Sequence, residues 1–260
     1  GDSEVGLQFS GAPISSNGGI NLGLIAQPGF GYGIQVGAGQ VTPISYSGGY
    51  ASPTSPGAGW AAIGINPTAS GFTLYWKNVN GTYASWDLNA AGALVTGRGL
   101  NAAELYQAEV GLGFDITGDS EVGLQFSGAP ISSNGDINLG LIQQAGFGYG
   151  IQVGEGEITP ISFGGGYAGI NNPGAGWQAI AVGRSDVNLE LYWQNGTTFA
   201  KWNLTSDGQL ISGELLSGSS LAFAEQQLGV NLDGDAQTGF TFSAPISTSP
   251  TATLGRTQFG

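Results

Sequence analysis

The sequence contains no cysteine, no histidine and no methionine. Without cysteine there is no disulfide framework and no thiolate-bound metal, and thiols give no indication of the redox compartment. Histidine and cysteine are also the usual general base and the best nucleophile in enzymes. The carboxylates that remain gather in loops, and the internal repeat described below replaces several of them with neutral residues. The sequence therefore predicts a protein without catalytic activity.

Charge is also scarce. Charged residues make up 9% of the chain, and 18 acidic against 5 basic residues give a net charge of −13. Such a surface repels nucleic acid and anionic membranes. No apolar run approaches the roughly 18 residues of a membrane span. We therefore expect no nucleic-acid partner and no membrane span. The start at Gly1, part-way through a repeated motif and without methionine, predicts a processed or trimmed N-terminus.

The sequence does contain an internal duplication. The run GDSEVGLQFSGAPISSNG occupies residues 1–18 and returns unchanged at 118–135, and a decayed third copy begins at Gly234. Self-similarity of this kind is typical of tandem architectures rather than of a single enzyme core. It predicts one β-rich repeat over 1–117, a second over 118–233, and a partial third over 234–260 that consists of a strand and a tail.

Apolar residues recur at every second position within each repeat, for example in residues 20–24 and 72–76. This period predicts short strands with one buried face, separated by glycine, proline and asparagine turns. A capping box at Asn101 and Glu104 predicts one helix in the first repeat, and Ser220 is the expected cap in the second. The predicted fold is all-β, with two tandem antiparallel domains of the sandwich, barrel or prism type, each with one short helix.

Glycine alternates with larger residues over 29–37 and again over 146–154. Glycine weakens an isolated strand, so its repeated use indicates the close approach of another backbone. That approach can be tight sheet packing inside each domain, or packing between subunits.

An acidic loop follows each predicted helix, with oxygen-bearing side chains at alternate positions. Alternate residues of a tight loop can converge on one point, as a hard cation such as calcium requires. The alternative is an Asx-turn that reverses the chain without a metal. We expect calcium, more strongly in the second loop because Thr117 replaces a carboxylate in the first. The predicted ligands are Asp115, Asp119 and Glu121 in the first loop and Asn231, Asp233, Asp235 and Gln237 in the second.

With these loops the chain resembles the tryptophan-rich domain of large cyanobacterial surface and secreted proteins. The resemblance rests on an aromatic hairpin at residues 74–87, a turn at Gly92, the capped helix and the loop at 231–235, and repeat two keeps the hairpin at 191–203. It covers roughly 55–119 and 172–235. The family's loop carries glycine where this chain has Ser120 and Ala236. The resemblance implies an extracellular, non-catalytic module.

Six tryptophans, three in each repeat, raise a second hypothesis. Trp60 and Trp177 each follow a Pro-Gly-Ala-Gly run at the start of a predicted strand, where an indole can lie exposed and stack on a sugar. The other four alternate with polar residues, and we expect them in the core.

The strand predicted around Phe240, Phe242 and Ile246 has two alternative partners. It can complete repeat two, as residues 122–131 would complete repeat one, or it can pair with a neighbouring molecule and build a head-to-tail filament. We predict an extracellular, cell-surface structural protein, either a self-assembling fibre subunit or a stalk segment of a larger adhesin. Its expected partners are copies of itself or a larger surface protein. The alternative is a carbohydrate-binding module that takes polysaccharide at Trp60 and Trp177.

Overall fold

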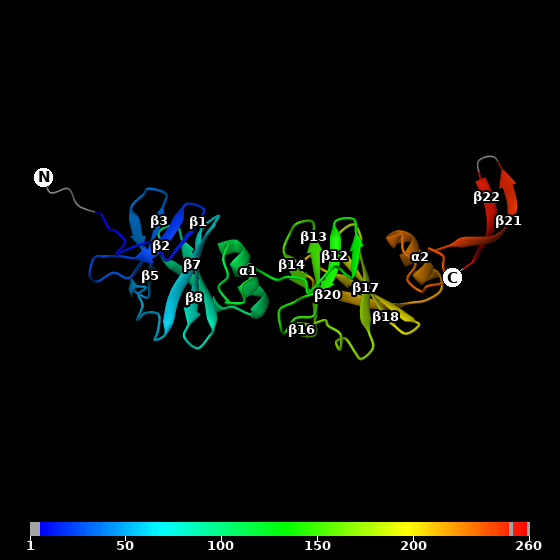
Figure 1. Cartoon of the computed structure of the whole chain (residues 1–260). Coiled ribbons are helices and arrows are strands. Elements are labelled where there is room, and N and C mark those ends of the chain that lie inside the picture. The colour runs from blue at the N-terminus through cyan, green and yellow to red at the C-terminus, as the bar shows by residue number, and fades with distance from the viewer. Residues whose placement is uncertain (1–5, 250–251, 259–260) are drawn as a thin grey trace. The chain divides into compact units, whose positions relative to one another are not determined.

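The computed structural model describes residues 6–249 and 252–258, and the side chains of residues 6–240. The chain divides into two compact units between Gly123 and Leu124. Figure 1 shows each unit as a group of strands with one helix. The predicted fold class is confirmed, because every sheet is antiparallel and each unit contains one short helix. In the part of the chain that the structure describes, no helix has the length and apolar character of a membrane span.

Unit 1 contains two four-stranded meander sheets joined by a small hairpin, with a helix after the second sheet. The first sheet is β1 (Ser15–Asn17), β2 (Ile20–Leu24), β3 (Tyr32–Val36) and β4 (Val41–Pro43). The hairpin is β5 (Ser45–Tyr46) and β6 (Gly49–Tyr50). The second sheet and the helix are β7 (Trp60–Thr68), β8 (Gly71–Asn78), β9 (Tyr83–Asn89), β10 (Leu94–Gly99) and α1 (Ala102–Leu112).

Unit 2 repeats this order element by element. Its first sheet is β11 (Ser132–Asn134), β12 (Ile137–Leu141), β13 (Tyr149–Val153) and β14 (Ile158–Pro160), and its small hairpin is β15 (Ser162–Phe163) and β16 (Gly166–Tyr167). The second sheet and the helix are β17 (Gln178–Arg184), β18 (Leu189–Asn195), β19 (Thr198–Leu204), β20 (Leu210–Leu216) and α2 (Ser219–Leu228). A separate two-stranded sheet follows, made of β21 (Thr241–Ser249) and β22 (Ala252–Gln258).

The two large sheets of each unit share one core. In unit 1 it joins Leu22 and Ile34 of the first sheet to Leu74 and Trp76 of the second, and unit 2 repeats it with the equivalent residues. Alternate residues of each strand supply it, as the period of two predicts. The helix packs on the other face of the second sheet, where Leu112 and its neighbours contact β7 and β8. Each unit therefore has three layers: sheet, sheet and helix.

The glycine run packs inside each unit. A Cβ atom at Gly31 would lie 2.0 Å from the carbonyl oxygen of Ala51, and one at Gly148 would lie 2.0 Å from that of Ala168. No side chain fits at this distance, so the backbone approach requires glycine. The structure therefore supports packing inside the domain as the reason for these glycines.

The helix starts differ from each other. Asn101 caps α1 with the complete predicted capping box, in which its side chain accepts from the amide of Glu104 and the Glu104 carboxylate accepts from the amide of Asn101. The prediction for the second helix is wrong, because Gly218 is the N-cap of α2 and makes no side-chain hydrogen bond. Ser220 lies in the first turn, and its hydroxyl bonds the backbone of Ser217 instead.

Candidate functional site

A buried glutamate organises each acidic loop. The Glu109 carboxylate on α1 is fully buried and accepts the amides of Ile116 and Thr117 on one oxygen and the amide of Gly123 on the other. Glu225 on α2 makes the equivalent three bonds with Leu232, Asp233 and Gly239, at 2.8 to 3.3 Å. Each carboxylate thus holds both ends of the loop that follows its helix. This explains why residues 118–123 lie with unit 1 although they open the second repeat.

The role of these two glutamates was not predicted from the sequence. An acidic residue within a helix is expected to be exposed to solvent, because charged side chains are rarely fully buried unless they are paired. The available signal was positional: the same residue type recurs at the same place in both repeats, between the apolar positions that face the sheet.

The first acidic loop is built from Asx-type hydrogen bonds. The Asp115 carboxylate accepts the amides of Gly118 and Ser120 and the hydroxyl of Thr117, at 2.5 to 3.1 Å. These donors, the Gly118 amide first, lower the pKa of Asp115 below its ordinary value, against the opposing effect of desolvation. Carboxylate oxygens of Glu109, Asp115 and Asp119 also lie within 4.8 Å of one another. Glu121 is exposed and lies outside this cluster.

The second loop repeats the turn with other residues. The Asn231 side chain accepts the amide of Gly234, Asp233 accepts that of Asp235, and Asp235 accepts that of Gln237. Only one oxygen of Asp235 is used in this way. The other, Oδ2, is buried and has no hydrogen-bond partner among the described residues. A buried carboxylate oxygen without a partner is unfavourable, so this oxygen fits a cation better than the bonded oxygens of the first loop do.

Two residues in these loops have left-handed backbone conformations. Ser120 has a φ of 74° and Ala236 a φ of 70°, a region that glycine adopts without steric conflict. These are the positions at which the chain departs from the glycine of the tryptophan-rich family. Glycine would suit these two positions because of their left-handed backbone.

The tryptophans line a cavity in unit 2. Trp177, Trp193 and Trp202 enclose about 320 Å³ together with Pro173 and Glu214. Trp193 and Trp202 lie 4.8 Å apart between ring centroids, and Trp76 and Trp86 repeat this arrangement in unit 1. As predicted, these four indoles belong to the cores. Trp60 and Trp177, which the carbohydrate-binding alternative places as exposed platforms, are half-buried and pack against the cores.

The indole nitrogens of Trp76 and Trp193 are buried and have no hydrogen-bond partner among the described residues. Buried indole N–H groups usually find an acceptor. The same unpartnered nitrogen occurs in both units, so it belongs to the shared packing of the cores.

The opening motif completes the unit that follows it. Residues 124–131 lie along the edge of the first sheet of unit 2, where Phe126 pairs with Ile142 and the amide of Ser127 donates to the carbonyl of Leu141. The expectation that this segment completes repeat one is therefore wrong. The Phe126 ring covers Gly140, since a Cβ atom at that glycine would lie 2.6 Å from the ring. Phe9, Ile25 and Gly23 repeat these contacts in unit 1.

The third copy of the motif has a different partner. Phe240, Phe242 and Ile246 align with Leu124, Phe126 and Ile131, with one glycine fewer between them. In the structure Phe242 and Ile246 lie in β21, which pairs with β22, a partner outside the two alternatives predicted from the sequence. The side chains of Phe242 and Ile246 lie outside the described part of the chain.

Comparison with known proteins agrees with the aromatic pattern. Residues 139–239 match a family model described as the tryptophan-rich Synechocystis species C-terminal domain. The matched residues lie within unit 2. The match begins within β12 and ends at Gly239, so it includes most of the first sheet as well as the aromatic hairpin and the acidic loop. No curated protein matches the chain.

Proposed function

We propose that the chain is an extracellular structural subunit that assembles with copies of itself by strand exchange. The observation that carries this proposal is the third copy of the opening motif. Its apolar positions Phe240, Phe242 and Ile246 repeat those with which residues 124–131 complete the first sheet of unit 2. The third copy thus carries the side chains of an edge strand.

The acceptor in this proposal is the corresponding sheet edge of another molecule, at Ile25 in unit 1 or Ile142 in unit 2. Each edge already pairs with an opening strand of its own chain. An incoming third copy would replace that strand with similar contacts, as in domain swapping. Each contact also releases β21 from β22 and the resident opening strand from the edge, so the exchange costs free energy and requires a high protein concentration. Because donor and acceptor are different surfaces, the contact is head-to-tail and extends into a filament unless the rotation closes a ring.

Truncation tests the donor strand. Removing residues 240–260 leaves the bond between Gly239 and Glu225 in place, so unit 2 should remain folded. We expect the full chain to form fibres in electron micrographs and the truncated chain to remain as single particles. Phe242→Ser should also reduce assembly, whereas Phe223→Ser, at an exposed aromatic position on α2, should not. Fibres from the truncated chain would show that this strand is not the donor.

Cross-linking tests the acceptor. The chain has no cysteine, so Phe242→Cys combined with Ile25→Cys or Ile142→Cys introduces one defined pair. Strand exchange predicts oligomeric ladders on a non-reducing gel with one of these pairs and not with Phe242→Cys and Val187→Cys. If the full chain gives only single particles, the stalk role in a larger adhesin is the better interpretation.

The tryptophan cavity favours a second candidate function, carbohydrate binding. Stacking on the half-buried Trp177, which lines this cavity, would suit a neutral sugar ring. Binding on a glycan array should then survive removal of residues 240–260 and fail in the Trp60→Ala, Trp177→Ala double variant. The opposite pattern would assign any sugar binding to the tail.

A further inference from the structure

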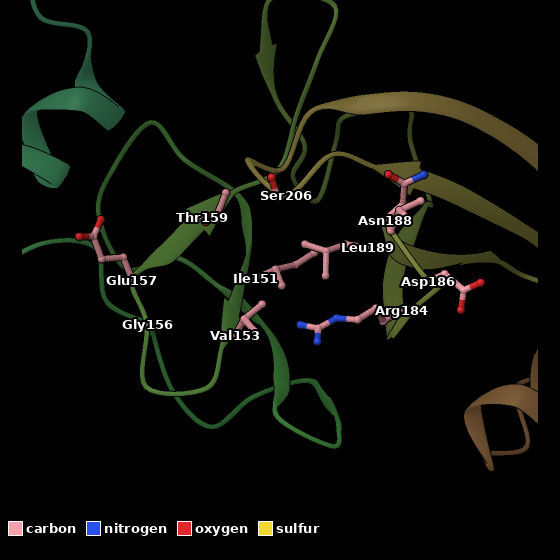
Figure 2. A pocket seen from close by; sticks show the side chains of 11 residues that line it. Ile151, Val153, Gly156, Glu157, Thr159, Arg184, Asp186, Asn188, Leu189 and Ser206 are labelled. Carbon is pink, nitrogen blue, oxygen red and sulfur yellow. The ribbon is translucent and has the colours of Figure 1, made fainter.

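Unit 2 has a second and larger cavity, of about 750 Å³, at one end of the space between its two sheets. Figure 2 shows it between β13 and β14 on one side and the β17–β18 hairpin on the other. Aliphatic side chains line it, among them Ile151, Val153 and Leu189, together with the polar Thr159, Asn188 and Ser206 and the charged Glu157, Arg184 and Asp186. This volume is in the range of sites that enclose small organic molecules.

Arg184 supplies the positive charge of this cavity. It is the last residue of β17, and its guanidinium makes no hydrogen bond or ion pair with any residue that the structure describes. Figure 2 shows the side chain extending over the cavity toward Val153, while the carboxylates of Glu157 and Asp186 point away from it. A guanidinium beside an aliphatic wall can form two parallel hydrogen bonds with a carboxylate.

Unit 1 provides an internal comparison. Arg184 pairs across the hairpin with Leu189, and the corresponding pair in unit 1 is Pro67 and Phe72. Phe72 packs against the core of unit 1. Unit 2 thus has the smaller Leu189 where unit 1 has Phe72. The cross-strand partner of Leu189 is the cationic Arg184, where unit 1 has Pro67.

We propose that this cavity binds a small amphiphilic carboxylate, with its aliphatic body between the sheets and its carboxylate on Arg184. The cavity walls contain no aromatic side chain, so the stacking that sugars use is absent here. The cation and the aliphatic floor together select an acid with an apolar body over a neutral or purely polar molecule. This proposal does not depend on strand exchange.

Octanoate, kept below its micelle concentration, is a suitable probe, with octanamide as the neutral control. Methyl NMR of the full chain should show saturable shifts at Ile151, Val153 and Leu189. Arg184→Gln should weaken octanoate binding at least about tenfold, because a hydrogen bond to a charged group is lost. It should leave octanamide binding nearly unchanged.

The cavity itself is tested by Leu189→Phe, which introduces the residue of unit 1 and should abolish the shifts at Ile151 and Val153 while the circular dichroism spectrum stays native. The double variant Pro67→Arg, Phe72→Leu should add a second octanoate site in unit 1, and Phe72→Leu alone should not. Equal binding of octanoate and octanamide, absence of saturable binding, or shifts centred on other residues would each overturn the proposal.

Discussion

The two units share a core and differ in their polar contacts. Most buried positions of the first sheet are the same in both, with Leu22 and Ile34 of unit 1 matching Leu139 and Ile151 of unit 2, whereas Ile158 replaces Val41. The charged residues on the helix-facing side of the second sheet differ between the two units. In unit 2, a hydrogen bond and two ion pairs join Tyr192, Glu190, Lys201 and Glu214 into one network. The equivalent positions of unit 1 hold Tyr75, Thr73, Ser85 and Arg98.

This difference separates what the fold requires from what each unit can vary. The glutamate that holds the acidic loop and the two closely packed indoles occur in both units with the same contacts. The helix cap, the metal-type ligands and the hairpin residues at the 750 Å³ cavity, Arg184 and Leu189, differ. We infer that the glutamate and the indoles belong to the shared architecture, and that specific binding is to be sought where the units differ.

The largest loss of stability is expected when a feature shared by both units is removed. Glu109→Gln or Glu225→Gln replaces a carboxylate that accepts three amides by a group with one acceptor oxygen, so at least one buried amide loses its partner. We expect each to destabilise its own unit by about 3 kcal/mol. Hydrogen exchange of residues 113–123 and of residues 229–239 measures the loss of stability in unit 1 and in unit 2 separately.

The exposed Glu121→Gln change, in the same loop, is the control and should have little effect. If Glu109→Gln and Glu225→Gln gave clearly different losses, the glutamates would not be equivalent in the two units.

Calcium should distinguish the two loops. Calcium binding stays a prediction, and the Oδ2 atom of Asp235, without a hydrogen-bond partner among the described residues, favours the second loop as the site. At a calcium concentration 100 times the dissociation constant, binding would stabilise the loop by about 2.7 kcal/mol. We expect calcium to slow hydrogen exchange more in residues 229–239 than in 113–123, reversibly with a chelator.

Asp235→Asn should remove that protection, and Asp119→Asn should not. An absence of calcium-dependent exchange in both loops would leave the Asx-turn as the complete explanation of their composition.

Glycine at the two left-handed loop positions should raise the stability of each unit by a smaller amount. A left-handed conformation costs a non-glycine residue about 1–2 kcal/mol, whereas glycine loses more backbone entropy on folding, by about 0.5–1 kcal/mol. Ser120→Gly and Ala236→Gly should therefore each stabilise by about 0.5 kcal/mol in thermal unfolding. Ala91→Gly, in a turn without positive φ, should instead destabilise slightly. Destabilisation by all three would show that the left-handed positions are not strained.

Local patterns predicted most of the fold. Alternation placed Leu74 and Trp76 in the core because the side-chain period of a strand is two, and the capping box located α1. The pairing of residues 124–131 with the following unit was missed because repeat boundaries in sequence do not reveal which sheet a strand joins. Glu109 and Glu225 were missed because their partners are backbone amides, which a sequence does not display.

The smallest expected effect is a pH response confined to one unit. The pKa of Asp115 is lowered in the folded chain, so this residue contributes stability above its unfolded pKa and loses it as the pH falls through the folded value, below about pH 4. Asn231 occupies this position in unit 2 and does not titrate. Between pH 6 and pH 2.5, the amide NMR signal of Gly118 should follow this titration and that of Gly234 should not. Asp115→Asn should make the two loops alike, and a Gly118 signal that still titrates in this variant would assign the response to another carboxylate.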